Sequence, residues 1–321
     1  MALSPLSGLI VIDEIQRAPE IFALIRYLVD THPDQKYLIL GSASRDLIRQ
    51  SSESLAGRVV YHELSGFGIH DVLPENLRKL WMRGGLPRSY IAGDDSRSRR
   101  WRQAYITTFL ERDIPQLGIT IPAATLRRFW IMLCHYHAQV INYSEFAGSF
   151  GISDMTVRKY IEILEGTFMV RVLQPWHVNT GKRLVKRPKL YLRDSGLLHT
   201  LMSVHSEKEL VTYNKLGASW EGFALEMAIR AIGKRNEELS FWATHSGAEV
   251  DLFRQENGCN WAVDIKYSSA PKLTPSMKSA LDDLSLDHLW VLYPGESTYR
   301  ISEKITVLPV MSIPVEWNYT S

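Results

Sequence analysis

The first seventy residues alternate short apolar runs with an amphipathic segment. Residues 9–12 and 37–40 are apolar runs that predict buried strands, and residues 21–28 carry apolar side chains at helical spacing. We expect strand, helix, strand, helix and strand in this order up to about residue 69. Such alternation predicts a parallel sheet that binds ligands at the carboxyl ends of its strands. Asp13, Glu14 and Ser42 all follow strand ends.

The middle of the chain, from about residue 73 to 215, predicts mostly helices and a winged helix at about 140–193. Two short amphipathic helices flank Gly151, and apolar residues 168–173 and 190–192 predict the two strands of a wing. In a winged helix the second helix faces the DNA groove and the wing meets phosphates. The residues that we expect to contact DNA are Arg158, Lys159, Lys182, Arg183, Lys186 and Arg187.

Charge supports this interpretation, although an alternative stays open. Residues 151–193 hold nine Lys and Arg against three Asp and Glu, and a compact basic patch favours a polyanionic partner. The alternative is a winged helix that only packs domains together. Met155 and Glu162 on the reading face argue against sharp base specificity.

The C-terminal region, from residue 216 to 321, predicts the order helix, strand, strand, strand, helix, strand. On the helix at 220–232, Glu221 lies inside the apolar arc, whereas Glu226 lies in a narrow polar sector with Gly222 and Arg230. A carboxylate directed into a core needs a cation or a metal. We therefore expect Glu221 to belong to a site and Glu226 to lie on the surface.

A hairpin turn at residues 257–258 fixes the register of the next two strands. Asn-Gly favours a two-residue turn, which pairs Asp251 with Asp264 and Glu249 with Lys266. Two like charges across a ladder repel each other, so a divalent cation between them is the obvious compensation.

These residues predict a metal site with Glu221, Asp251 and Asp264 as ligands and Lys266 beside it. Carboxylates, a metal and a lysine together suit metal-dependent phosphodiester hydrolysis. The alternative is a surface salt bridge between Glu249 and Lys266 on a solvated face.

The acidic pair Asp13-Glu14 after an apolar strand is how P-loop NTPases present a Mg²⁺-binding carboxylate beside a water-activating one. The phosphate-binding pattern G-x-x-x-x-G-K-[ST] does not occur in the 321 residues. The sequence therefore predicts part of a nucleotide-binding core without its phosphate-binding loop.

The ordered motifs together resemble a prokaryotic AAA-type ATPase family with a C-terminal domain of unknown function, DUF4143. The matching stretches are residues 9–20 (LIVIDEIQRAPE), 41–44 (GSAS), 53–58 (ESLAGR), 109–118 (FLERDIPQLG), 191–198 (YLRDSGLL), 217–221 (GASWE) and 247–266. The resemblance implies an α/β multi-domain fold: a partial P-loop core over 1–72 that starts at Walker B, a helical and winged-helix middle over 73–215, and an αβββαβ domain similar to PD-(D/E)xK nucleases over 216–321.

The resemblance also implies roles for individual residues. Asp13 would bind Mg²⁺, Glu14 would activate water, Ser42 would sense the γ-phosphate of ATP, and Arg58 would be an arginine sensor or finger. The nuclease pattern maps onto Glu221, Asp251, Asp264 and Lys266.

Three functional interpretations compete. The first is an ATPase-family protein, either a truncated copy or one with its start codon assigned too late, and it predicts weak or absent ATP binding by this polypeptide. The second is a Mg²⁺-dependent DNA nuclease, and the third is a non-enzymatic DNA- or protein-binding module. DNA is the expected partner, with nucleotide and a second copy of the chain as further candidates.

The remaining composition points to a cytoplasmic protein. The two cysteines, Cys134 and Cys259, lack metal-ligand spacing, as suits a reduced compartment. No apolar run approaches the roughly 18 residues needed to span a membrane.

Overall fold

The computed structural model describes residues 3–15, 18, 20–41, 55–177, 183–314 and 317. The chain divides into two compact units. The first contains Met1–Leu64 with Ile161–Met169, and the second contains Ser65–Tyr160 with Val170–Ser321. None of the helices in the described ranges is long and apolar enough to cross a membrane.

The first unit contains a small β-α-β element, as the sequence predicts. Strands β1 (Gly8–Ile12) and β2 (Gln35–Ile39) are parallel, and α1 (Ile21–Thr31) connects them. Phe22 and Ile25 of α1 form a core with Ile15 and with one face of the strands. The second helix and third strand expected before residue 69 are not seen in the described residues 55–68, which contain no strand, and residues 42–54 lie outside the described residues.

The other face of this two-stranded sheet is apolar and open. Leu9, Val11 and Leu38 are 65%, 54% and 46% exposed, and Leu40 is exposed beside them. Period-two alternation places them on the side of the sheet away from α1. The prediction that these strands are buried is therefore wrong for this face of the sheet.

The second unit begins with helices, as expected for residues 74–139. They are η2 (Ile69–Asp71), η3 (Pro74–Asn76), α3 (Leu77–Arg83), α4 (Pro87–Tyr90), α5 (Asp95–Thr108), the π-helical turn η4 (Phe109–Asp113), α6 (Ile114–Gln116) and α7 (Ala123–His135).

Two helices and three short strands follow the first helical group. They are β3 (Gln139–Val140), α8 (Tyr143–Phe150), α9 (Asp154–Gly166), β4 (Val170–Pro175) and β5 (Lys189–Leu192). Gly151 ends α8 in the left-handed conformation with a φ of 63°, which is the turn that the sequence predicts there. Strand β5 pairs antiparallel with both β3 and β4.

The C-terminal part contains the predicted order of elements and two additional strands. It comprises α10 (Ser195–Leu201), α11 (Glu207–Thr212), α12 (Leu216–Ile232), η5 (Asn236–Glu238), β6 (Ser240–Ala243), β7 (Glu249–Glu256), β8 (Cys259–Ile265), α13 (Pro275–Asp283), β9 (His288–Tyr293), β10 (Tyr299–Ser302), β11 (Ile305–Pro309) and η6 (Val310–Ser312).

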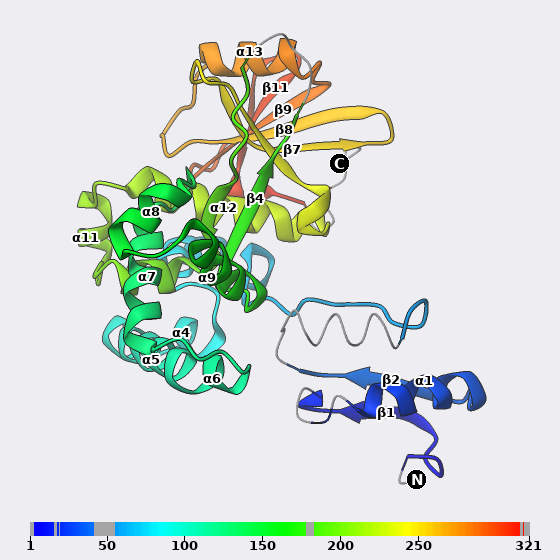
Figure 1. The fold of residues 1–321 in the computed structure, drawn as a ribbon. Helices are drawn as coiled ribbons and strands as arrows, with labels where there is room; N and C mark the ends of the chain where they lie inside the picture. The colour runs from blue at the N-terminus through cyan, green and yellow to red at the C-terminus, as the bar shows by residue number, and fades with distance from the viewer. Residues whose placement is uncertain are drawn as a thin grey trace. The chain divides into compact units, whose positions relative to one another are not determined.

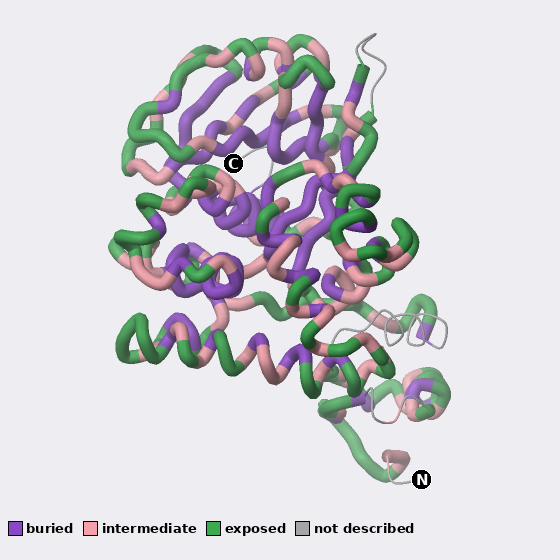
Figure 2. The backbone as a smooth tube through the Cα atoms, turned by 60° about the vertical axis from the view of Figure 1, so that its left-hand side comes forward, coloured by how far each residue is buried: buried purple, intermediate pink, exposed green. Residues whose placement is uncertain are grey.

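A single mixed sheet runs through this unit and carries its core. The described strands follow the order β10-β11-β9-β8-β7-β6-β4-β5-β3, and β4 joins β6 through a parallel pairing at Gln174 and Ser240. Helices α12 and α13 pack on opposite sides of the sheet (Figure 1). Buried residues run through its strands (Figure 2). The sheet therefore continues across the domain boundary expected at residue 216.

The hairpin register is confirmed. Leu252 pairs with Val263 and Glu256 pairs with Cys259, around the predicted turn. Between β6 and β7 the register shifts, so that two residues of β7, at 251–252, lie opposite one residue of β6. A bulge of this kind changes the direction of nearby side chains, and here it lies at Asp251.

A tight contact between α3 and α10 explains much of the motif at residues 191–198. Asp194 accepts hydrogen bonds from the backbone N–H of Leu197 and of Gly85, both at 2.8 Å. A Cβ atom on Gly196 would lie 2.1 Å from the carbonyl oxygen of Arg83. The motif is therefore a close backbone-to-backbone junction.

We predict that Gly196→Ala lowers the free energy of unfolding by about 2 kcal/mol, because the added methyl group meets backbone that cannot move aside. The matched control is Gly148→Ala in α8, where a Cβ atom meets nothing within 4 Å. That change is expected to be neutral or to stabilise by up to about 1 kcal/mol. Urea unfolding measures the free energy of unfolding of both variants. Equal values for the two variants would contradict the close backbone contact at Gly196.

Candidate functional site

Asp13 and Glu14 lie at the carboxyl end of β1, where a parallel sheet binds ligands. Both are exposed, and the Asp13 carboxylate accepts a hydrogen bond from the Glu14 backbone N–H at 2.9 Å. Glu14 has a φ of 56°, a left-handed conformation that is uncommon for residues other than glycine. Ser42 lies outside the described residues.

Arg58 lies elsewhere in this unit. Its guanidinium holds the Asp30 carboxylate through two hydrogen bonds of 2.7 and 3.0 Å. Asp30 is near the end of α1, which returns the chain from the carboxyl edge of the sheet to its amino edge. Within this unit Arg58 is therefore held at the opposite edge from Asp13 and Glu14.

The second candidate site is an acidic cluster in the large sheet. The sequence prediction named four of its members, and the structure brings them together with three further residues. The members are Lys189 and Tyr191 of β5, Glu221 of α12, Glu249 and Asp251 of β7, Asp264 of β8, and Lys266 just after β8.

Lys189 is the centre of the cluster. Its side chain is 3% exposed, and its Nζ atom lies 3.3 Å from Glu221, 3.4 Å from Glu249 and 3.2 Å from Asp251. Burial alone lowers the pKa of a lysine, but Tyr191 and the three carboxylates outweigh burial and raise the pKa of Lys189 well above its ordinary value. Lys189 is therefore a cation in the folded protein.

The two aspartates lie beside each other, as the register predicts. Burial and the neighbouring Asp251 raise the pKa of Asp264 to about 7. Although burial opposes it, Lys189 and Lys266 lower the pKa of Asp251. Lys266 donates to Asp264 at 2.7 Å, whereas Glu249 contacts Lys189. The alternative pairing of Glu249 with Lys266 on a solvated face is not what the structure contains, because Asp251 and Asp264 are buried.

Glu221 completes the cluster from the helix. It accepts a hydrogen bond of 2.8 Å from the Tyr191 hydroxyl as well as the contact from Lys189. Burial and the charge on Asp251 raise the pKa of Glu221 to about 8.

The expected divalent cation does not fit the residues as they are arranged. Oxygen ligands of this kind suit Mg²⁺, but Lys189 already contacts one oxygen each of Glu221 and Asp251, and the Ile265 backbone N–H takes the other oxygen of Asp251 at 2.8 Å. Within the described residues, no three His, Cys, Asp or Glu side chains are grouped so as to hold a metal. The chain supplies its own cation where the sequence predicts a metal.

Glu226 is a correction to the sequence prediction. It is 1% exposed and binds Arg171 through two bonds of 2.5 and 3.0 Å, with Arg193 at 3.5 Å. The polar sector of α12 faces protein rather than solvent, because Arg230 on the same stripe donates to the backbone of Gly66 and Phe67. The stripe is an internal contact with the preceding helical region.

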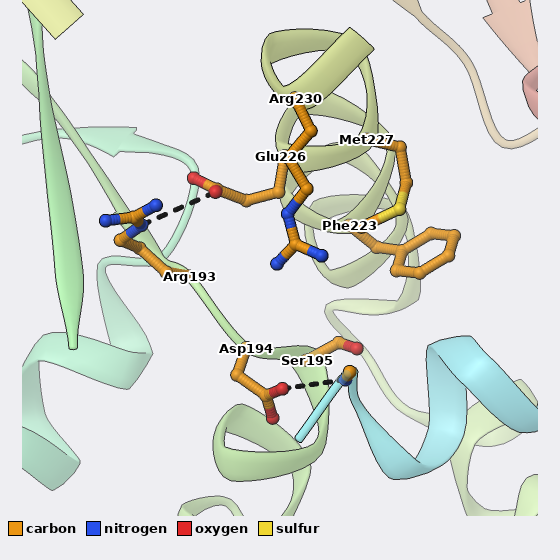
Figure 3. Close-up of a pocket in the computed structure, with 8 residues that line it drawn as sticks. Arg193, Asp194, Ser195, Phe223, Glu226, Met227 and Arg230 are labelled. Carbon is orange, nitrogen blue, oxygen red and sulfur yellow. Dashed lines mark hydrogen bonds and ion pairs between the residues drawn. The ribbon is translucent and has the colours of Figure 1, made fainter. Parts of the chain in front are cut away.

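A small cavity lies beside Glu226, between α12 and the start of α10 (Figure 3). Arg193, Asp194 and Arg230 are among the residues that line it. It has room for about one water molecule, so it is too small for a nucleotide or a metabolite.

All five described residues of the set expected to contact DNA are exposed. Lys159, Arg183, Lys186 and Arg187 are exposed, and Lys182 lies outside the described residues. Arg158 is exposed and stacks on the Tyr143 ring at 3.8 Å from its centroid.

The described part of the loop before β5, residues 183–188, is attached to the sheet. The backbone N–H of Val185 donates to Ala243, and that of His245 donates to Arg183. Three of the nine basic residues in 151–193 are also engaged in ion pairs inside the fold, namely the buried Arg171 and Lys189 and the mostly covered Arg193. The outward basic charge is thus smaller than the sequence count.

Sequence reasoning missed Lys189, Tyr191 and Arg171. Each is on a short strand that was interpreted as part of a wing. Lys189 and Tyr191 are two residues apart and therefore share one face of β5. The sequence signal was slight, because Lys189 is the first residue of β5 and follows a basic loop.

Comparison with known proteins covers nearly the whole chain. Residues 2–73 match an AAA domain, residues 74–208 match the domain of unknown function DUF8612, and residues 216–313 match the domain of unknown function DUF4143. Two similar proteins are the uncharacterized protein Mb2031c of Mycobacterium bovis and the uncharacterized protein Rv2008c of Mycobacterium tuberculosis. Each is 46% identical over 314 residues, which cover 98% of this chain and 71% of the relative.

We predict that Glu226→Gln lowers the stability of the fold by about 3 kcal/mol, because it leaves Arg171 buried without its counter-charge. Burial raises the pKa of Glu226, but Arg171 and Arg193 outweigh burial and lower it from 4.5 to about 2. The stabilisation is therefore complete above about pH 4.5 and is lost as the pH falls towards 2.

Thermal melts between pH 2 and pH 7 measure this effect. The exposed Glu237→Gln is the control, with an expected change within about 0.5 kcal/mol. A Glu226→Gln protein that melts like the wild type at pH 7 would show that the ion pair does not stabilise the fold.

Proposed function

Because the chain belongs to the family of AAA-domain proteins that carry a C-terminal DUF4143 domain, we propose that it is a DNA-associated ATPase-type protein. The observation that carries the proposal is the Asp13-Glu14 pair at the carboxyl end of β1, inside the stretch that matches an AAA domain. This is the part of a nucleotide-binding core that handles the metal and the attacking water.

Each residue at this edge has a proposed task. The Asp13 carboxylate would hold Mg²⁺, which neutralises the phosphate charge of a bound nucleotide, and Glu14 would orient and deprotonate the attacking water. Ser42 would contact the γ-phosphate. The exposure of both carboxylates supports these tasks, since a ligand can reach them.

The open apolar face of the first sheet supports the same assignment. Leu9, Val11 and Leu38 have the character of a surface covered by a further layer in a nucleotide-binding core. The 321 residues contain no G-x-x-x-x-G-K-[ST] loop. Asp13 and Glu14 can bind metal and water, but no backbone cradle of that type grips the triphosphate.

We predict that the 321-residue polypeptide binds ATP with a Kd weaker than about 100 µM, and that the binding depends on Mg²⁺. Asp13→Asn is expected to weaken it at least ~10-fold, because it removes the metal ligand, whereas Glu14→Gln is expected to retain it. Titration with a fluorescent ATP analogue measures all three proteins. Binding in the nanomolar range, or binding that Asp13→Asn leaves unchanged, would rule out this role.

A second candidate function, DNA binding without catalysis, is favoured by the order of elements around α9. Helix α7, β3, helices α8 and α9, then β4 and β5 follow the order of a winged helix, and β5 lies between β3 and β4. Met155, Arg158, Lys159 and Glu162 are exposed on α9.

This surface suits phosphates better than bases. Lys159 and the loop residues Arg183 and Arg187 are exposed cations, whereas Met155 is apolar and Glu162 would repel a phosphate. The attachment of the loop to the sheet supports the alternative of a packing role for part of the winged helix. We therefore propose weak DNA binding that does not depend on sequence.

Nuclease activity is the alternative that the acidic cluster disfavours. Phosphodiester hydrolysis of this kind needs a metal between the carboxylates, and Lys189 contacts the same carboxylates. We assign no hydrolytic step to Glu221, Asp251, Asp264 or Lys266.

We predict that Lys159→Ala and Arg187→Ala each weaken DNA binding and each reduce the slope of log Kd against log salt by about 1, since each removes one phosphate contact. The exposed Lys272→Ala is a matched control for loss of a surface charge and is expected to change neither value. Fluorescence anisotropy with several duplexes across a salt series gives the slopes. If the control lowers binding as much as the two variants do, the surface around α9 is not the DNA site.

A further inference from the structure

The acidic cluster contains a buried cation that belongs to the chain itself. The Lys189 ammonium lies 3.2 to 3.4 Å from three carboxylates that come from α12 and β7. At these distances the three N–H groups of the ammonium can each donate to one of the three carboxylates. A divalent metal would take the same oxygens, although at 2.0 to 2.6 Å.

Hydrogen-bond donors of the chain already contact several of the carboxylate oxygens that a metal would need. Glu221 Oε1 accepts from both Lys189 and Tyr191, and the two oxygens of Asp251 accept from Lys189 and from the Ile265 backbone N–H. Asp264 Oδ1 accepts from Lys266. Each expected metal ligand is thus engaged through at least one oxygen by donors of this chain, and Asp251 through both.

We propose that Lys189 is the built-in counter-ion of this cluster, that it occupies the position a divalent metal would take, and that it closes the cluster to metal ions. The like charge of a buried ammonium repels a metal ion from the oxygens it contacts. The cluster then serves as an ionic connection between β5, α12 and β7.

The closure is part of the fold. Lys189 lies on β5, before the stretch that matches DUF4143, and its backbone pairs with Val140 on one side and Leu173 on the other. Pairing on both sides fixes which way its side chain points. The lysine therefore cannot leave by the movement of a loop.

This inference concerns a site separate from Asp13 and Glu14, so its test is independent of ATP binding. The experiment is a calorimetric titration of the 321-residue protein with Mn²⁺, alone and with three substitutions. Lys189→Met keeps the length of the side chain and removes its charge. Lys266→Met removes the other lysine of the cluster and is the charge-matched control.

We expect the wild type and Lys266→Met to show no saturable Mn²⁺ binding up to about 1 mM of the kind that Asp251→Asn removes, and Lys189→Met to bind Mn²⁺ at the cluster at least ~10-fold more tightly than either. Adding Asp251→Asn to Lys189→Met is expected to abolish the gain. A thermal melt of Lys189→Met gives a second readout, because Mn²⁺ should raise its Tm and leave the wild-type Tm unchanged.

Several outcomes would overturn the proposal. Wild-type protein that binds Mn²⁺ in a way that Asp251→Asn removes would show that the metal and Lys189 coexist. An equal increase in Mn²⁺ affinity in Lys266→Met would show that net charge, and not the position of Lys189, controls metal binding. Folded Lys189→Met with unchanged Mn²⁺ affinity would show that Lys189 does not exclude the metal. If Lys189→Met fails to fold, the double variant Lys189→Met/Glu249→Gln removes one negative charge as well. The same increase in Mn²⁺ affinity in that variant would support the proposal, and its absence would overturn it.

Discussion

Neutralisation of buried carboxylates is the constraint on which the second unit depends. A buried charge without a partner costs several kcal/mol, and this unit places two groups of carboxylates beside α12. Glu226 is neutralised by Arg171 of β4, and Asp251 by Lys189 of β5, which also contacts Glu221. In both cases the cation comes from the middle of the chain. The same two strands extend the large sheet through the pairing of β4 with β6. Ion pairs and backbone hydrogen bonds therefore both join the middle of the chain to its C-terminal part.

This arrangement separates two kinds of acidic site that look similar in the sequence. Asp13 and Glu14 are exposed at a strand end. Asp251 and Asp264 are buried, and lysines from the chain contact both. The proposed chemistry with an external metal and water would belong to the first site, whereas the second site holds elements of the fold together. The winged-helix order of elements would serve as a DNA-facing surface and as a support for the sheet.

The sequence predicted those features that depend on residues close together in the chain. The β1-α1-β2 element follows from apolar periodicity, and the Asn257-Gly258 turn fixed the hairpin register that brings Asp251 beside Asp264. Lys189 could not be found in this way, because its partners are 32 to 62 residues away and its strand resembled a wing. Glu226 was misplaced because a helical wheel shows which side of a helix is polar but not what covers that side.

Anomalous diffraction from crystals of the wild-type protein soaked in Mn²⁺ would locate the cation of the acidic cluster. If Lys189 is that cation, its side chain has density between Glu221 and Asp251, and no anomalous peak lies within coordination distance of their oxygens. A manganese peak bound to those two carboxylates, with the lysine displaced, would contradict this role of Lys189.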